Sequence, residues 1–183
     1  MKHALTIAGS DCSGGAGIQA DLKTFAAHGV YGMSVIVSVV AENTERVISI
    51  EDISPQVICD QIDAVFTDID VHAVKVGMLS GAEQMQAVAQ RLSQYRPQNV
   101  VIDPVMVAKG GCALMQPEAL ETMRRLILPL ADILTPNLPE AEALSGMQIR
   151  SDKDMQKAAQ AMMQMGAKSV VIKGGHLTGK ESA

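Results

Sequence analysis

Aromatic side chains are scarce in this sequence. Its 183 residues include two Phe, two Tyr and no Trp, while twelve Met and many aliphatic residues supply the apolar content. Single-stranded nucleic acids bind by stacking their bases on aromatic rings, so this scarcity argues against such a surface. The formal net charge of −5 also gives no general attraction for polyanions. We therefore expect no nucleic-acid partner, and a phosphate ligand would be held locally by a few lysines and backbone amides.

Cysteine is also rare, and long hydrophobic runs are missing. Cys12, Cys59 and Cys112 are odd in number and widely spaced, which predicts reduced thiols in a cytoplasmic protein rather than a disulfide framework or a zinc site. The apolar stretch near the N-terminus is too short for a signal peptide, and no later run approaches membrane-spanning length. With 48% hydrophobic residues, the chain predicts one domain over 1–183 and no membrane partner.

Short β-branched runs alternate with amphipathic helical patterns along the chain. Strands are predicted at 3–8, 33–40, 72–77, 99–103, 132–134 and 169–173, with a weaker candidate at 47–50. Helices are predicted at about 17–28, 55–68, 81–95, 117–128, 137–145 and 152–165. This alternation is typical of an α/β fold in which a mostly parallel sheet is covered on both faces. Ligands of such sheets bind at the carboxyl ends of the strands, so the candidate site lies there.

A glycine-rich loop follows the first predicted strand. Residues 15–20 satisfy the pattern G-x-G-x-x-G/A, and Glu42 ends the next strand where a dinucleotide fold places its ribose-binding acid. A nicotinamide-dependent oxidoreductase is therefore one interpretation. The loop before Gly15 is longer than that motif needs, however, and Asp11 would bring negative charge close to a pyrophosphate. No Gly-Lys-Ser/Thr follows, so the loop is not a P-loop either.

Polar residues that could bind a phosphate or its metal ion follow three later predicted strands. Asn137 and Glu140 lie three apart at the start of a helix, where their oxygens could hold Mg²⁺ through water. The alternative is that the two residues form a capping box. Asp103 is a second candidate oxygen ligand, and Lys173 suits a transferring phosphate or is simply a solvated lysine.

In combination these segments resemble a known family, the hydroxymethylpyrimidine and phosphomethylpyrimidine kinases of thiamine biosynthesis. The resemblance runs from residue 4 to about 178 and is carried by "ALTIAGSDCSGGAGIQADLKTFAAHGVYGMSVI", "KVGML", "VVIDPVMVAKGG", "ILTPNLPEA" and "VVIKGGH". It implies a ribokinase-like three-layer α/β/α fold. It also implies a kinase that uses ATP and Mg²⁺ to phosphorylate the hydroxymethyl group of the pyrimidine and then its monophosphate, and that assembles as a homodimer.

The resemblance also implies roles for individual residues. Gly9, Asp21, Glu42, Met78 and Val105 match substrate-binding positions, with Asp21 suited to a ring nitrogen or an amino group of the pyrimidine. The alternative for Asp21 is a solvated carboxylate favoured by the helix dipole. By the same resemblance Lys173 and Asn137 bind the nucleotide, whereas Glu140 and Asp103 bind the metal.

Two departures from the family pattern bear on function. The family usually has glutamine in place of Glu42, and ionised glutamate accepts hydrogen bonds but cannot donate them. Pyridoxal kinases are the nearest alternative in substrate, although they tend to read "AMDP" where this sequence reads "AENT".

The second departure is at the end of the sequence. The family continues past Ala183 into a glycine-rich segment that forms the anion hole and carries the catalytic cysteine or aspartate. We therefore expect a C-terminally truncated kinase domain with no catalytic residue of its own beyond a supporting Lys173. A remnant that binds the pyrimidine without turnover is thus the other alternative to an active kinase.

Overall fold

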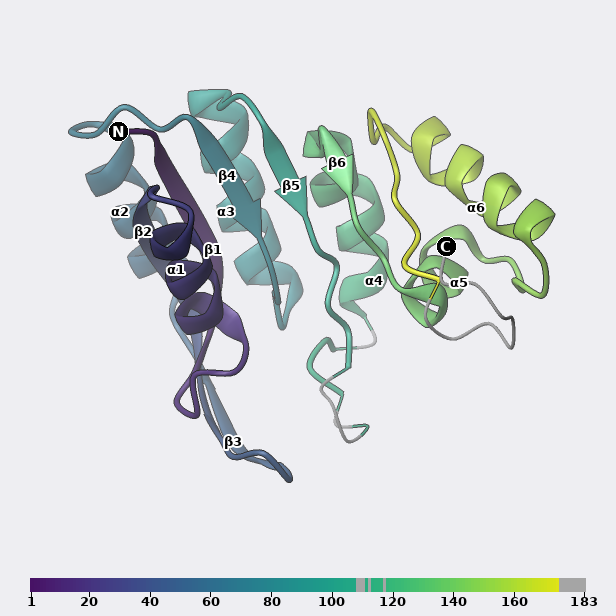
Figure 1. The fold of residues 1–183 in the computed structure, drawn as a ribbon, viewed down its shortest axis with the longest axis horizontal. Coiled ribbons are helices and arrows are strands. Elements are labelled where there is room, and N and C mark those ends of the chain that lie inside the picture. The colour runs from purple at the N-terminus through teal and green to yellow at the C-terminus, as the bar shows by residue number, and fades with distance from the viewer. Residues whose placement is uncertain (108–110, 112, 117, 175–183) are drawn as a thin grey trace.

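A computed structural model describes residues 1–107, 111, 113–116 and 118–174 of the chain. Its centre is a six-stranded sheet with the order β3-β2-β1-β4-β5-β6. Figure 1 shows the sheet with β1 near its middle and helices in front of it and behind it. The strands are β1 (His3–Asp11), β2 (Tyr31–Glu42), β3 (Val47–Asp52), β4 (Ala73–Val76), β5 (Val100–Ile102) and β6 (Ile133–Leu134).

All neighbouring strands run parallel except β2 and β3, which form an antiparallel pair. In the central strand β1, eight of the nine residues are buried. Residues 4–8 are apolar apart from Thr6, as expected for a parallel sheet covered on both faces. The weaker strand candidate at 47–50 is confirmed as β3, which lies at the edge of the sheet and extends beyond it together with the end of β2 (Figure 1).

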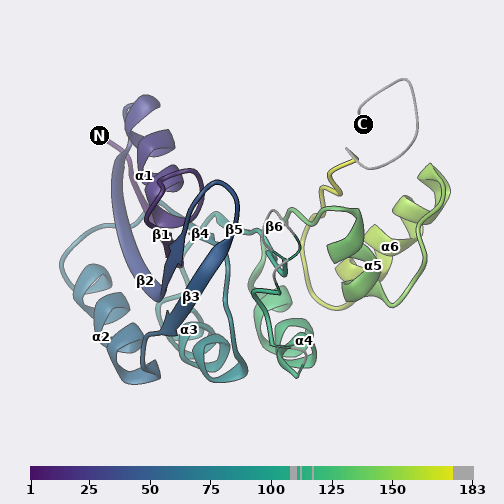
Figure 2. The same ribbon diagram turned by 90° about the horizontal axis from the view of Figure 1, so that it is seen from below.

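The helices divide between the two faces of the sheet. Figure 2 shows α1 alone on one face and α2, α3 and α4 on the other, while α5 and α6 lie beyond β6. The helices are α1 (Gly17–Ala27), α2 (Pro55–Phe66), α3 (Ala82–Tyr95), α4 (Ala119–Thr122), α5 (Leu138–Ser145) and α6 (Asp152–Gln164). This arrangement confirms the predicted three-layer α/β/α fold. None of the helices in the described part of the chain is long and apolar enough to cross a membrane.

Two predicted elements differ from the structure. The first of these is the predicted helix at 117–128, whose first residue lies outside the described part of the chain. Its α-helical segment is only α4, which is followed by a π-helical turn (η1, Met123–Ile127) and then by a 3₁₀ turn (η2, Leu128–Leu130). Pro129 explains this ending, because proline lacks the N–H that would continue an α-helix. The predicted strand at 169–173 was wrong as a continuous element: the structure has only isolated bridges, from Val170 to Leu134 and from Lys173 to Asn137.

Candidate functional site

A cavity of about 510 Å³ opens at the carboxyl ends of the central strands. The end of β1, the glycine loop and α1 form part of its wall, and the ends of β2, β4 and β5 complete it. Six of the predicted site residues line this one cavity: Gly9, Asp21, Glu42, Met78, Asp103 and Val105. They come from five separate segments of the chain, and the parallel topology brings them together.

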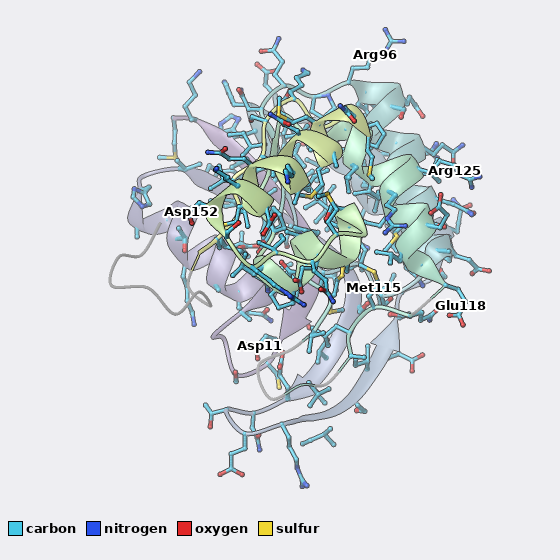
Figure 3. The ribbon with its side chains drawn as sticks, turned by 90° about the vertical axis from the view of Figure 1, so that its right-hand side faces the viewer. Asp11, Arg96, Met115, Glu118, Arg125 and Asp152 are labelled. Carbon is cyan, nitrogen blue, oxygen red and sulfur yellow. The ribbon has the colours of Figure 1, made fainter. Side chains whose placement is uncertain are left out.

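A wider hollow of about 770 Å³ lies at the opposite end of the sheet, beside the N-terminus and the last turns of α1, α2 and α3. Arg96 lines this hollow and Asp11 lines the first cavity, and Figure 3 shows Arg96 at the top of the molecule and Asp11 in its lower half. Helix C-termini carry a partial negative charge, so they do not favour a phosphate. The cavity at the carboxyl ends is therefore the better candidate for phosphate chemistry.

The Asp11 carboxylate accepts hydrogen bonds from the backbone amides of the glycine loop. Asp11 is 4% exposed, and its carboxylate accepts hydrogen bonds from the N–H groups of Ser13, Gly15 and Ala16 at 2.7, 2.9 and 2.8 Å. Burial raises the pKa of Asp11, but the hydrogen bonds from Ser13, Ala16 and Gly15 together outweigh it and leave that pKa below its ordinary value. Amides that already hold an internal carboxylate are not free for a pyrophosphate, which overturns the dinucleotide interpretation.

Gly17 supports the same conclusion. Its φ is +56°, and a Cβ at this position would lie 2.4 Å from the carbonyl oxygen of Gly9. The second glycine of the G-x-G pattern therefore lets α1 begin close against the end of β1. The close approach that this glycine permits is to the protein's own backbone and not to a ligand. A side chain at this position would be strained both by its backbone conformation and by lack of space.

Asp21 lines the cavity and is held by two neighbours. Its Oδ2 accepts a hydrogen bond from the Thr6 hydroxyl at 2.6 Å and another from the Lys75 ammonium at 2.9 Å. The Asp21 side chain is only 18% exposed, so the alternative of a solvated first-turn carboxylate was wrong. Sequence reasoning missed Lys75, although a lysine within the apolar strand "AVKV" was an available signal.

Glu42 ends β2 and reaches the cavity from the other side of the loop. Its backbone N–H donates to the Cys12 thiol, which in turn donates to the Glu42 carbonyl at 3.1 Å. Burial, and then repulsion from the Asp11 carboxylate, raise the pKa of Glu42 above its ordinary value. A carboxyl group with a raised pKa beside a ligand cavity can change its hydrogen-bonding role with pH.

Apolar contacts complete this part of the cavity. Met78 follows β4 and is 8% exposed, and a Cβ at Gly9 would lie 3.0 Å from its terminal methyl carbon. Glycine at position 9 thus keeps room for the Met78 side chain. Val105 follows β5 in a tight turn in which its N–H donates to the carbonyl of Asp103 at 2.8 Å. These apolar side chains line the same cavity as Asp21 and Glu42, so a flat, uncharged ring could pack against them.

Asp103 connects the cavity to a second group of predicted residues. Its Oδ1 accepts a hydrogen bond from the Lys173 ammonium at 2.8 Å and another from the Thr135 hydroxyl at 3.1 Å. Lys173 is fixed by its backbone, whose N–H donates to the carbonyl of Pro136. The structure thus brings Asp103 and Lys173 into contact across 70 residues of sequence.

Asn137 and Glu140 form the capping box that the sequence left open as an alternative. The Asn137 side chain accepts from the Glu140 N–H at 2.9 Å, and the Glu140 carboxylate accepts from the Asn137 N–H at 2.8 Å. Glu140 is 4% exposed. Burial raises the pKa of Glu140, and the nearby Asp103 carboxylate raises it further. The Asn137 hydrogen bond and the attraction of Lys173 lower this pKa, but by less, so it stays above its ordinary value. The cap therefore also places a carboxylate near Asp103 and Lys173.

The oxygen donors of this second group suit Mg²⁺. Glu140 and Asp103 supply carboxylate oxygens, and Mg²⁺ binds through few carboxylates while it keeps several waters. The described residues contain no cluster of three or more histidine, cysteine or acidic side chains that could hold a metal by themselves. Any Mg²⁺ here would need further ligands from water and from nucleotide phosphates.

The protein combines a mostly parallel sheet covered on both faces with a cavity and a lysine–carboxylate pair at the carboxyl edge of that sheet. This is the arrangement expected of a small-molecule kinase of the ribokinase-like class. Residues 11–183 match the family described as phosphomethylpyrimidine kinase. The chain belongs to this family.

Two curated relatives show how much of the family's length the chain spans. It is 51% identical over 180 residues to a hydroxymethylpyrimidine/phosphomethylpyrimidine kinase of Rhizobium meliloti, a match that covers 98% of this chain and 67% of that protein. It is 49% identical over 178 residues to a thiamine biosynthesis bifunctional protein of Geobacter sulfurreducens, covering 97% of this chain and 36% of that one. The chain thus spans about two thirds of the single kinase and just over one third of the bifunctional protein.

Two solved structures share the fold. The phosphomethylpyrimidine kinase of Clostridium difficile superposes with a TM-score of 0.93 at 49% identity, covering all of this chain and 78% of that one. An ADP complex of Bacillus subtilis pyridoxal kinase superposes with a TM-score of 0.90 at 42% identity, covering all of this chain and 70% of that one. These similarities confirm the ribokinase-like fold that the sequence predicted.

Proposed function

We propose that this chain acts in the ATP-dependent phosphorylation of 4-amino-5-hydroxymethyl-2-methylpyrimidine and of its monophosphate, in thiamine biosynthesis. The observation that carries the proposal is one cavity lined by Asp21, Glu42 and Met78 and bordered by Asp103, which contacts Lys173. Two carboxylates suit the amino group of the pyrimidine, and the apolar side chains suit its ring. Similarity to kinases that are named for these substrates supports the same assignment.

In this proposal Lys173 and Asn137 face the nucleotide phosphates, and Glu140 and Asp103 hold Mg²⁺ through water. The metal, when bound, neutralises charge on the transferring phosphate. The Lys173 ammonium attracts the same phosphate electrostatically, and its contact with Asp103 fixes where that positive charge lies. A homodimer and a cytoplasmic location stay predictions.

Replacing Asp21 with alanine tests the substrate assignment. We expect pyrimidine affinity to fall roughly five- to hundredfold, because the amino group of the ligand loses a buried acceptor. Isothermal titration calorimetry with the pyrimidine measures the change, and Asp68→Ala, which removes an exposed carboxylate, is the control. Unchanged affinity in Asp21→Ala would contradict the assignment.

Pyridoxal is the competing substrate, because a pyridoxal kinase shares 42% identity with this chain. Titration with pyridoxal under the same conditions distinguishes the two. Tighter binding of pyridoxal than of the pyrimidine would replace the proposed substrate.

Replacing Glu140 with glutamine tests the metal assignment. Glutamine retains the geometry of the cap but removes the negative charge, so Mg-nucleotide affinity should fall severalfold while pyrimidine affinity stays unchanged. Calorimetry with Mg²⁺ and a non-hydrolysable ATP analogue measures this effect. The control is Glu121→Gln, which changes a carboxylate that is 74% exposed. Loss of stability without any change in nucleotide affinity would leave Glu140 with the capping role alone.

A further inference from the structure

Lys75 is a charged residue in the middle of an apolar sheet. It lies on β4, which pairs with β1 on one side and with β5 on the other. Its neighbours Val74 and Val76 are buried, and the Lys75 side chain itself is 24% exposed. An ammonium group in such a strand loses part of its hydration, and this loss must be offset by a partner.

That partner is Asp21, and the contact is shared with Thr6. The Lys75 ammonium and the Thr6 hydroxyl both donate to Oδ2 of Asp21, at 2.9 and 2.6 Å. The other carboxylate oxygen, Oδ1, receives no hydrogen bond from the described residues. Since Asp21 lines the cavity, one of its oxygens is fixed within the protein and the other remains available to a ligand.

Gly77 keeps the space that the Lys75 side chain occupies. A Cβ at position 77 would lie 2.8 Å from the Lys75 ammonium nitrogen and 3.0 Å from Cβ of Ala8. Contacts this short would force the lysine to move. The segment "KVGM" therefore both supplies the ammonium group and makes room for it beside Asp21.

We propose that Lys75 is a positioning residue that selects for the amino group of the substrate by acting through Asp21. This inference rests on the proposed pyrimidine function. Lys75 and Thr6 both donate to one oxygen of the Asp21 side chain and so fix its orientation, and an ionised carboxylate only accepts hydrogen bonds. The available oxygen then favours a ligand with an N–H donor, such as the exocyclic amine. A ring nitrogen with a lone pair would be repelled at the same place.

The test compares two ligands in four proteins. The ligands are 4-amino-5-hydroxymethyl-2-methylpyrimidine and the same pyrimidine without its amino group, and the proteins are the wild type, Lys75→Met, Asp21→Asn and the double variant. We expect the wild type to prefer the amino ligand by about tenfold, a typical effect of one hydrogen bond to a charged group. Lys75→Met should lose most of this preference, and the double variant should resemble Asp21→Asn, because the two residues act as one unit.

Two further variants separate positioning from general stability. Lys75→Arg keeps the positive charge and should retain most of the preference. Lys168→Met removes a lysine that pairs with Asp132 outside the cavity, and should leave the preference unchanged. Thermal unfolding of every variant checks that each is folded.

The outcomes are distinguishable. A wild-type preference that persists in Lys75→Met would overturn the inference alone and leave the proposed function standing. If both affinities fall equally in that variant, Lys75 has a merely structural role. Failure of the wild type to bind either pyrimidine would overturn both.

Discussion

Replacing Asp11 with alanine is expected to lower the free energy of unfolding by about 3–5 kcal/mol, measured by urea denaturation at neutral pH. The carboxylate accepts hydrogen bonds from three backbone amides of the glycine loop. Without it, the N–H groups of Ser13, Gly15 and Ala16 lose a charged acceptor, and each such bond contributes about 1.5–3 kcal/mol in comparable settings. The expected loss is smaller than the sum of the three contributions, because water can reach some of the freed amides.

Chemical rescue makes this prediction specific to the amides. Acetate carries the carboxylate that Asp11→Ala lacks, so high concentrations of acetate should restore part of the lost stability, with chloride at equal ionic strength as the control. The exposed Asp68→Ala variant should change stability by less than about 0.5 kcal/mol and should not respond to acetate. A loss below about 1 kcal/mol in Asp11→Ala would contradict the role of Asp11 as an internal anion.

The effect of Asp11 should also depend on pH. Its pKa in the folded protein lies below the ordinary value, because the hydrogen bonds outweigh the effect of burial. A lowered pKa contributes stability that is present above the pKa of the unfolded chain and is lost as pH falls through the folded value. The difference in stability between the wild type and Asp11→Ala should therefore shrink below about pH 4.

Much of the fold could be predicted because alternation of apolar runs and amphipathic patterns is a local property of the sequence. The predicted helix at 55–68 and the observed α2 (Pro55–Phe66) differ by two residues, and β3 appears where the weaker candidate lay. The predicted strand at 169–173 shows the limit of this reasoning. Its β-branched run is suited to a strand, but continuous pairing depends on a neighbouring strand, and β6 ends at Leu134.

The candidate site was predictable in outline, since the carboxyl ends of parallel strands meet at one edge. Gly9, Asp21, Glu42 and Met78 do line one cavity. Their hydrogen bonds could not be read from the sequence. The contact between Lys75 and Asp21 joins residues 54 apart, and only the pairing of β4 with β1 brings them together. The glycine loop suggested an external anion, whereas its amides bind an internal one from Asp11.

Glu42 is expected to make pyrimidine binding depend on pH. Its pKa is raised by burial and by the Asp11 carboxylate, so it gains a proton at a higher pH than an ordinary glutamate. Ionised Glu42 accepts a hydrogen bond from the amino group of the pyrimidine but cannot donate to a ring nitrogen; protonated Glu42 can donate. Wild-type affinity should therefore rise in acid, and as the pH is lowered the rise should begin at a higher pH than an ordinary glutamate would give, measured by calorimetry.

Replacing Glu42 with glutamine should raise affinity at pH 8 by roughly ten- to hundredfold, because the amide supplies the donor that the ring nitrogen otherwise lacks. The same variant should lack the part of the pH dependence that comes from Glu42 when it is titrated over the same pH range as the wild type, which separates titration of Glu42 from protonation of the pyrimidine itself. Stability gives an independent measurement. A raised carboxyl pKa contributes stability that is lost as pH rises through the folded value, so Glu42→Gln should be more stable than the wild type at neutral pH and lose that advantage in acid. Equal affinities of the two proteins at pH 8 would show that the ring nitrogen of the ligand does not face residue 42. Asp21 would then be the carboxylate that selects the pyrimidine.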